Sequence, residues 1–101
     1  MVRAAVEDRR VFWRRHALDR MMTRGISRQD VKDLLTAGEV IERYPEDWPY
    51  PSGLFVGEPG GRVLHVVAAL SEEECRVYVI TAYEPDLERF EADYRTRRRH
   101  R

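Results

Sequence analysis

The chain has 101 residues, of which 43% are hydrophobic and 36% are charged, with a formal net charge of zero and one cysteine. This length gives one domain with a modest core, and it contains neither an apolar run that could span a bilayer nor the apolar centre of a signal peptide. A single cysteine excludes an internal disulfide and a cysteine-based zinc site. We therefore expect a cytoplasmic globular protein that does not enter a membrane.

Charge is segregated along the chain although it sums to zero. Residues 1–32 have a net charge of +5, residues 33–94 a net charge of −10, and residues 95–101 a net charge of +5. This pattern favours a polyanion-binding face built from the N-terminal helix. Seventeen of the eighteen basic residues are arginine, which suits bidentate phosphate contacts. A high-GC genome gives the same arginine bias, so both explanations stay open.

The first predicted helix runs from about residue 7 to residue 24. Its apolar side is formed by five residues: Trp13, Ala17, Leu18, Met21 and Met22. His16, Arg20 and Arg24 follow one another at one-turn spacing along the border of that side, and we call them the polar row. A side chain at this border is held by core packing while its polar head stays accessible.

A second helix is predicted directly after a tight turn. Gly25 ends the first helix in the left-handed conformation. Ser27 and Asp30 predict a capping box, and Ile26 is placed to form a hydrophobic staple. The buried stripe of the second helix consists of three residues: Val31, Leu34 and Leu35.

Four antiparallel strands follow, predicted over residues 39–44, 54–58, 62–70 and 75–84. Three prolines make residues 45–53 a loop, and a closing helix capped by Asp86 is expected after Pro85. The order predicts an α+β fold, with two N-terminal helices packed on a roughly four-stranded antiparallel sheet and a C-terminal helix. We expect one domain over residues 1–95 and a basic, flexible tail over residues 96–101.

Strand alternation groups the polar residues of the last two strands. His65, Thr81 and Tyr83 fall on one face if the more continuous apolar set lies under the helices. We expect that face to be the more open one.

This set of side chains suits metal-independent RNA cleavage, and it contains no metal-ligand motif and implies no cofactor. His16 and His65 are candidates for acid and base near neutral pH, with Tyr83 as a further catalytic candidate. Arg20 is the candidate catalytic phosphate clamp. Three further residues are candidates for phosphate or RNA binding: Arg24, Arg62 and Thr81.

Each candidate also has a structural interpretation, and these stay open. His65 in an apolar strand suits a hydrogen-bonded core residue, and His16 suits a solvated helix surface. Arg24 is placed to cap the last carbonyls of its helix, while Tyr83 suits core packing. The arginine-rich tail suits a flexible end or a weak nucleic-acid arm.

Three segments, "HALDRMMTRGIS" (16–27), "GRVLHVV" (61–67) and "VITAYEPD" (79–86), resemble the domain-of-unknown-function family 4258, over roughly residues 14 to 95. That family resembles the RelE-like and MqsR-like toxins within the wider barnase and colicin ribonuclease group. The resemblance implies a toxin that cleaves messenger RNA, including mRNA on the ribosome. The polar residues of the family motifs correspond to His16, Arg20, Arg24, His65, Thr81 and Tyr83.

The resemblance also implies a partner, because family members often neighbour small zinc-ribbon proteins that resemble antitoxins. The expected partners are therefore RNA and a cognate antitoxin. The chain departs from the strongly basic RelE-like toxins in its zero net charge. The rival hypothesis is a non-catalytic RNA- or protein-binding module, such as a degenerate toxin or a regulatory subunit.

Overall fold

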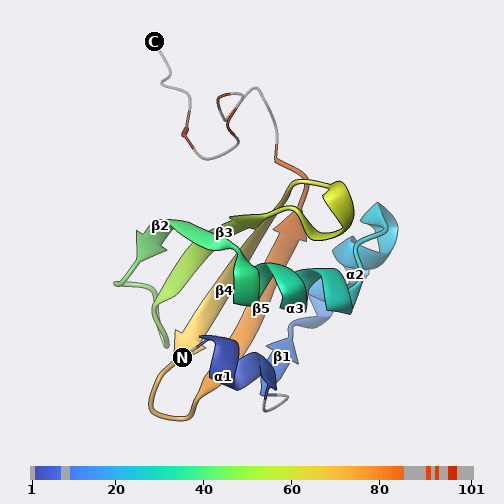
Figure 1. Ribbon diagram of the computed structural model, residues 1–101. Helices are drawn as coiled ribbons and strands as arrows, with labels where there is room; N and C mark the ends of the chain where they lie inside the picture. The colour runs from blue at the N-terminus through green and yellow to red at the C-terminus, as the bar shows by residue number, and fades with distance from the viewer. Residues whose placement is uncertain (1, 8–9, 86–90, 92, 94–95, 98–101) are drawn as a thin grey trace.

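The computed structural model describes residues 2–7, 10–85, 91, 93 and 96–97. Within this part of the chain, helices pack against a five-stranded sheet of order β1-β5-β4-β3-β2 (Figure 1). The elements are α1 (Val2–Glu7), β1 (Val11–Trp13), α2 (Arg15–Arg24), α3 (Arg28–Ala37), β2 (Glu39–Tyr44), β3 (Ser52–Gly57), the short 3-10 helix η1 (Pro59–Gly61), β4 (Leu64–Ser71) and β5 (Arg76–Tyr83). The predicted α+β class is confirmed, but the sheet is mixed and has one strand more than expected.

The additional strand lies where one helix over residues 7–24 was predicted, so that prediction was wrong. β1 runs parallel to β5, with Phe12 opposite Tyr78. A Val-Phe-Trp segment suits a strand because β-branched and aromatic side chains pack well on a sheet, and pairing with β5 overrides the helical period. α2 begins only at Arg15, and it still contains the whole polar row at one-turn spacing.

The predicted pair of helices is confirmed. Gly25 ends α2 with φ 66° and ψ 34°, in the left-handed region. At the start of α3, Ser27 Oγ accepts a hydrogen bond from Asp30 N at 2.9 Å, and the Asp30 carboxylate accepts one from Ser27 N at 3.3 Å. This capping box satisfies two backbone donors of the first helical turn. Ile26 and the predicted stripe of α3 are buried in the core.

Strands β2 to β5 form antiparallel neighbours as predicted, but β5 contains a bulge. The pairing with β4 shifts between Val79 and Thr81, which leaves Ile80 as an extra residue. Simple alternation puts Val79 on the same face as Thr81 and Tyr83. The bulge breaks that alternation, so that Val79 enters the core while Thr81 and Tyr83 line the opposite side.

The core lies between the helices and one face of the sheet, with α1 and α3 in front of the strands in Figure 1. Its most buried members include Ala17, Met21, Val31, Leu34, Val66, Val79 and Ala82. His65 lies on the opposite face, between Val56 and Tyr83 in the strand register. The expectation that this face is open is wrong at His65, whose exposed fraction is 0%.

The predicted C-terminal helix begins at Asp86, and most of it lies outside the described residues. The residues that are described in this segment are not helical: Glu91, Asp93, Thr96 and Arg97. Arg97 lies against β2, where its Nε is 2.5 Å from the carboxylate of Glu42. None of the helices in the described ranges is long and apolar enough to cross a membrane.

Candidate functional site

A cleft lies between α2 and the C-terminal end of β5. Its volume is about 480 Å³, and it is lined by Arg20, Arg24, Thr81, Tyr83 and Glu84. Two of these side chains come from the helix and three from the strand and the residue after it. We call this the arginine cleft.

α2 lies here because β1 is short. β1 pairs with β5 only as far as Val79, so the rest of that sheet edge is left for the helix. α2 packs on the core through Ala17 and Met21, which are buried. Because residues three and four apart share one side of a helix, Arg20 and Arg24 lie together beside the strand.

Arg24 is tied to the strand by a hydrogen bond. Its Nη1 donates to the carbonyl oxygen of Ala82 at 3.0 Å. An edge strand presents backbone groups that need partners, and this guanidinium satisfies one of them. Arg24 does not cap its own helix, as one interpretation of the sequence proposed. The bond instead fixes Arg24 over the cleft.

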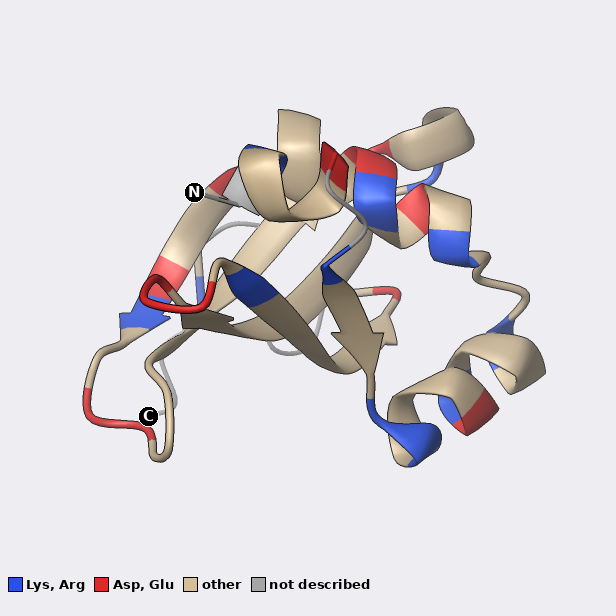
Figure 2. Cartoon of the chain, turned by 90° about the horizontal axis from the view of Figure 1, so that it is seen from below, with Lys and Arg blue, Asp and Glu red and all other residues tan. Residues whose placement is uncertain are grey.

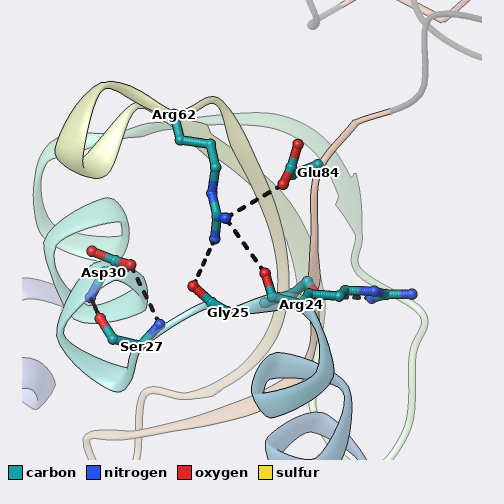
Figure 3. A network of polar contacts seen from close by, with 7 residues as sticks. Arg24, Gly25, Ser27, Asp30, Arg62 and Glu84 are labelled. Atoms are coloured by element: carbon teal, nitrogen blue, oxygen red, sulfur yellow. Dashed lines mark hydrogen bonds and ion pairs between the residues drawn. The ribbon is translucent and has the colours of Figure 1, made fainter.

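Arg62, and not Arg24, caps the C-terminal end of α2. Its Nη1 and Nη2 donate to the carbonyl oxygens of Arg24 and Gly25, at 3.4 and 3.1 Å, and Nη1 lies 3.4 Å from Glu84 Oε1 (Figure 3). Figure 3 shows the Arg24 side chain pointing away from this guanidinium. Arg62, predicted as a phosphate-binding residue, therefore holds the end of α2, η1 and the end of β5 together, and it does not line the cleft.

On the sheet side, Tyr83 contacts His65. Their ring centroids are 5.6 Å apart, with an angle of 62° between the ring planes. His65 has no exposed surface, so its ring cannot touch a molecule that occupies the cleft in this arrangement. It supports the ring of Tyr83 from within the sheet layer.

His65 also interacts with a charged cluster on β2. Burial raises the pKa of Glu42, but hydrogen bonds from Arg97 and Tyr44, together with the charges of Arg97 and His65, lower it below its ordinary value. Burial and the hydrogen bond to Glu42 raise the pKa of Tyr44. The carboxylate of Glu42 and the guanidinium of Arg97 are thus stabilised in their ionised forms, whereas Tyr44 is stabilised in its neutral form.

Four of the seven site residues predicted from sequence meet in the arginine cleft: Arg20, Arg24, Thr81 and Tyr83. His16 is exposed on the first turn of α2, and neither it nor His65 is among the residues that line the cleft. Glu84 lines the cleft but was missed. Its position directly after Tyr83 in the "ITAYEPD" motif was the available signal.

The positive charge of the site is local. Blue and red positions are mixed along α3 in Figure 2, whereas α2 carries three arginines and one aspartate. In the cleft, Arg20 and Arg24 face a single carboxylate, that of Glu84, which already pairs with Arg62. One anionic group is therefore the natural occupant.

Among the described residues, no group of three or more His, Cys, Asp or Glu side chains is placed to hold a metal ion. No curated protein and no solved structure matches the chain. The model of the family described as "Domain of unknown function (DUF4258)" matches residues 13–84, a range that contains every lining residue of the arginine cleft. The chain belongs to this family, as its sequence motifs indicated.

Proposed function

We propose that the protein is a metal-independent endoribonuclease of the toxin–antitoxin type that cleaves messenger RNA. The observation that carries the proposal is the convergence of Arg20 and Arg24 with the hydroxyl-bearing Thr81 and Tyr83 in one cleft. The resemblance of the family to RelE-like and MqsR-like toxins supports the choice of RNA. Action on messenger RNA places the protein in the cytoplasm.

The cleft suits the phosphate of an RNA chain. A guanidinium presents a flat fork of donors that matches two phosphate oxygens. Arg20 and Arg24 hold the phosphate from the helix side, and Thr81 donates a hydrogen bond from the strand side. The same donors stabilise the extra negative charge of the phosphorane as the reaction proceeds.

Cleavage in this arrangement needs a proton acceptor and a proton donor. The ribose 2′-oxygen attacks the neighbouring phosphorus as its proton passes to the acceptor. The bond between phosphorus and the 5′-oxygen breaks, and that oxygen takes a proton from Tyr83. Glu84 is the acceptor within the cleft, while His16, one turn before Arg20, is the acceptor that the sequence motif suggests. The products are a 2′,3′-cyclic phosphate and a 5′-hydroxyl.

In this mechanism His65 is a positioning residue. Its contact with Tyr83 holds the phenol in the lining of the cleft. Replacement by Leu keeps an apolar side chain of similar size but removes the ring contact, so the rate of cleavage falls while RNA affinity changes little. Replacement by Gln, which keeps a polar group at that position, restores part of the rate.

The test is incubation of the purified protein with single-stranded RNA in excess chelator. We expect fragments that end in 2′,3′-cyclic phosphate or 3′-phosphate. Arg20→Ala lowers the rate about 10² to 10³-fold, the usual cost of losing one donor to a transition-state anion. Arg15→Ala, on the same helix but outside the cleft lining, is the matched control. An unchanged rate in Arg20→Ala would remove the arginine cleft from the mechanism.

The acceptor is identified by comparing two variants in the same assay. Glu84→Gln abolishes most of the cleavage if the carboxylate accepts the proton, whereas His16→Ala does so if the imidazole accepts it.

In cells, expression of the intact chain is expected to arrest growth, and the double variant His16→Ala, Arg20→Ala is expected to relieve the arrest. Toxicity that persists in the double variant would contradict the proposal.

A second candidate function is a non-catalytic RNA- or protein-binding module. The observation that favours it is that neither histidine lines the arginine cleft. Retention of RNA on the protein without cleavage, in the same chelator experiment, would select this function.

The proposed protein partner is a cognate antitoxin, and a small zinc-ribbon protein is the expected type. Residues 33–94 carry a net charge of −10, which suits a partner with basic segments. Co-expression with a candidate small zinc-ribbon protein should yield a complex that suppresses both cleavage and growth arrest. Failure of the two chains to co-purify would exclude that antitoxin.

A further inference from the structure

A second cleft lies beside β5, and three of its lining residues are aromatic. Its volume is about 390 Å³, and its lining includes Arg14, Asp47, Trp48, Tyr50 and Tyr78. This volume falls within the range of about 300 to 1,000 Å³ that is typical of small-molecule sites.

Three rings are stacked beside this cleft. Tyr78 lies between Tyr50, at 5.3 Å between centroids and 4° between planes, and Phe12, at 5.5 Å and 28°. The guanidinium carbon of Arg76 lies 5.3 Å from the centroid of the Phe12 ring. We call Phe12, Trp48, Tyr50 and Tyr78 the aromatic platform.

The fold holds these rings in place from two sides. Phe12 and Tyr78 are direct neighbours across the β1–β5 pairing. Tyr50 comes from the proline-rich loop between β2 and β3, and its hydroxyl donates to Glu74 at 3.1 Å. The stack of Phe12, Tyr50 and Tyr78 therefore exists before any ligand binds, which lowers the entropic cost of binding.

The platform has exposed surface that core packing does not explain. Trp48 is 90% exposed and Phe12 is 43% exposed. Trp48 lies in the wall of the cleft, and a large exposed aromatic group in such a wall is typical of binding sites. Trp48 contributes almost nothing to the hydrophobic core, so stability gives no reason for a tryptophan there.

The charges of this cleft differ from those of the arginine cleft. Glu74 pairs with Arg76 at 2.7 Å, and the carboxylate of Asp47 accepts a hydrogen bond from Ser52. Arg14 and Asp47 line the cleft with one charge of each sign. A flat, uncharged group with polar edges suits such a site better than an anion does.

The two clefts are neighbours along one strand. Tyr78 and Ile80 line the aromatic cleft, and Thr81 and Tyr83 line the arginine cleft. Thr81 comes three positions after Tyr78 along the strand, a distance of about 10 Å. Arg14, which lines the aromatic cleft, comes immediately before α2.

We propose that the aromatic platform binds unpaired bases of single-stranded RNA next to the phosphate held in the arginine cleft. This inference rests on the proposed function for the choice of RNA. Bases stack on aromatic side chains whatever their sequence, because every base has a π-face, and arginines beside the rings hold the backbone. The two parts of a nucleotide thus bind at different places, the base on the rings and the phosphate between the arginines.

The test measures the binding of a labelled RNA of about ten unpaired nucleotides and of an abasic chain of the same length and charge, both in chelator. Because base stacking contributes about 1–3 kcal/mol per base, Trp48→Ala is expected to raise the Kd for the intact RNA by about 5- to 150-fold. The Kd for the abasic chain stays the same. Trp48→Phe restores most of the affinity, since it keeps an aromatic ring.

Met22→Ala is the matched control, because Met22 is 82% exposed on α2 and lines neither cleft. Arg20→Ala should weaken both chains alike, since both carry phosphates. If Trp48→Ala leaves the Kd for intact RNA unchanged while Arg20→Ala raises it, the inference is overturned and the proposed function stands. The aromatic platform would then bind a protein partner instead of RNA bases. Stacking-dependent binding without cleavage supports the inference and overturns the nuclease function. No RNA binding by the intact chain overturns both.

Discussion

The two clefts along β5 share a strand but differ in chemistry. The arginine cleft has two guanidinium groups and two hydroxyl-bearing residues in its lining, whereas the aromatic cleft has stacked rings and charges of both signs. The first attracts an anion, and the second favours a flat neutral group.

This difference arises from where β1 stops. As far as Val79, β5 has a strand beside it, and the ring of Phe12 stacks on Tyr78. Beyond Val79 a helix lies beside β5, and its arginines face the strand. One strand can therefore present two kinds of surface, since its neighbour changes along its length.

The largest expected difference between the two clefts is the loss of RNA cleavage when the hydroxyl of Tyr83 is removed. Tyr83→Phe removes the proposed proton donor and keeps the ring that contacts His65. The rate of RNA cleavage should fall about 10² to 10⁴-fold, the range for loss of a general acid, at nearly constant RNA affinity. Single-turnover cleavage and equilibrium binding measure the two quantities.

Tyr78→Phe is the matched control, because it removes a hydroxyl in the aromatic cleft and keeps the stacking. It should leave the cleavage rate within a few-fold of the intact protein, since about 1.4 kcal/mol is needed for a tenfold change. Equal losses in the two variants would contradict the assignment of chemistry to the arginine cleft alone.

A smaller effect is expected from Arg62, which supports the arginine cleft from outside. Arg62→Met removes the hydrogen bonds to the last carbonyls of α2 and the ion pair with Glu84. We expect a loss of about 1 kcal/mol in the free energy of unfolding and a drop of about tenfold in cleavage, as Arg24 loses its fixed position. Thermal unfolding and cleavage assays measure these changes.

Salt dependence distinguishes this positioning role from a direct contact with RNA. A residue that binds a phosphate of a single strand contributes about 0.7 to the slope of log K against log salt. Arg62→Met should leave that slope unchanged, whereas Arg20→Ala should reduce it. A reduced slope in Arg62→Met would show that Arg62 binds RNA itself.

The smallest effect concerns the cluster on β2, away from both clefts. The pKa of Glu42 is below its ordinary value when the protein is folded. The ionised carboxylate therefore adds stability above the unfolded pKa, near 4.5, and that stability is lost as the pH falls through the folded pKa. Glu42→Gln should lower the free energy of unfolding at pH 7 by about 0.5 to 1 kcal/mol. The effect is small because the ion pair of Glu42 with Arg97 is partly exposed.

The difference between Glu42→Gln and the intact protein should shrink as the pH falls below 4.5. Chemical unfolding at several pH values measures it, with Glu46→Gln, an exposed loop glutamate, as the control. A constant difference across that pH range would contradict the linkage. Neither variant should change RNA cleavage, since neither residue lines a cleft.

Local signals predicted much of the fold. Gly25 and the capping box of Ser27 gave the turn between α2 and α3, because these features depend only on neighbouring residues. β1 was missed because its pairing partner, β5, lies more than sixty residues further along the chain. No local pattern in residues 11–13 reports that pairing.

The site was predicted only in part, because local spacing was visible in the sequence but contacts between distant segments were not. The helical spacing of the polar row brought Arg20 and Arg24 to one cleft, and the family motifs supplied Thr81 and Tyr83. The burial of His65 depends on what packs over the sheet, which alternation along a strand does not reveal. The partners of Arg62 depend on a contact between η1 and the end of α2, so sequence alone suggested a phosphate instead.

The most direct test of the central claim is an NMR titration of the protein with an RNA chain whose 2′-hydroxyls are methylated, so that it binds but cannot be cleaved. The account predicts that the guanidinium signals of Arg20 and Arg24 and the backbone amide of Tyr83 shift together, with the signals of Arg15 unchanged. Saturation of binding with these three sites unmoved, and with shifts confined to another surface, would contradict it.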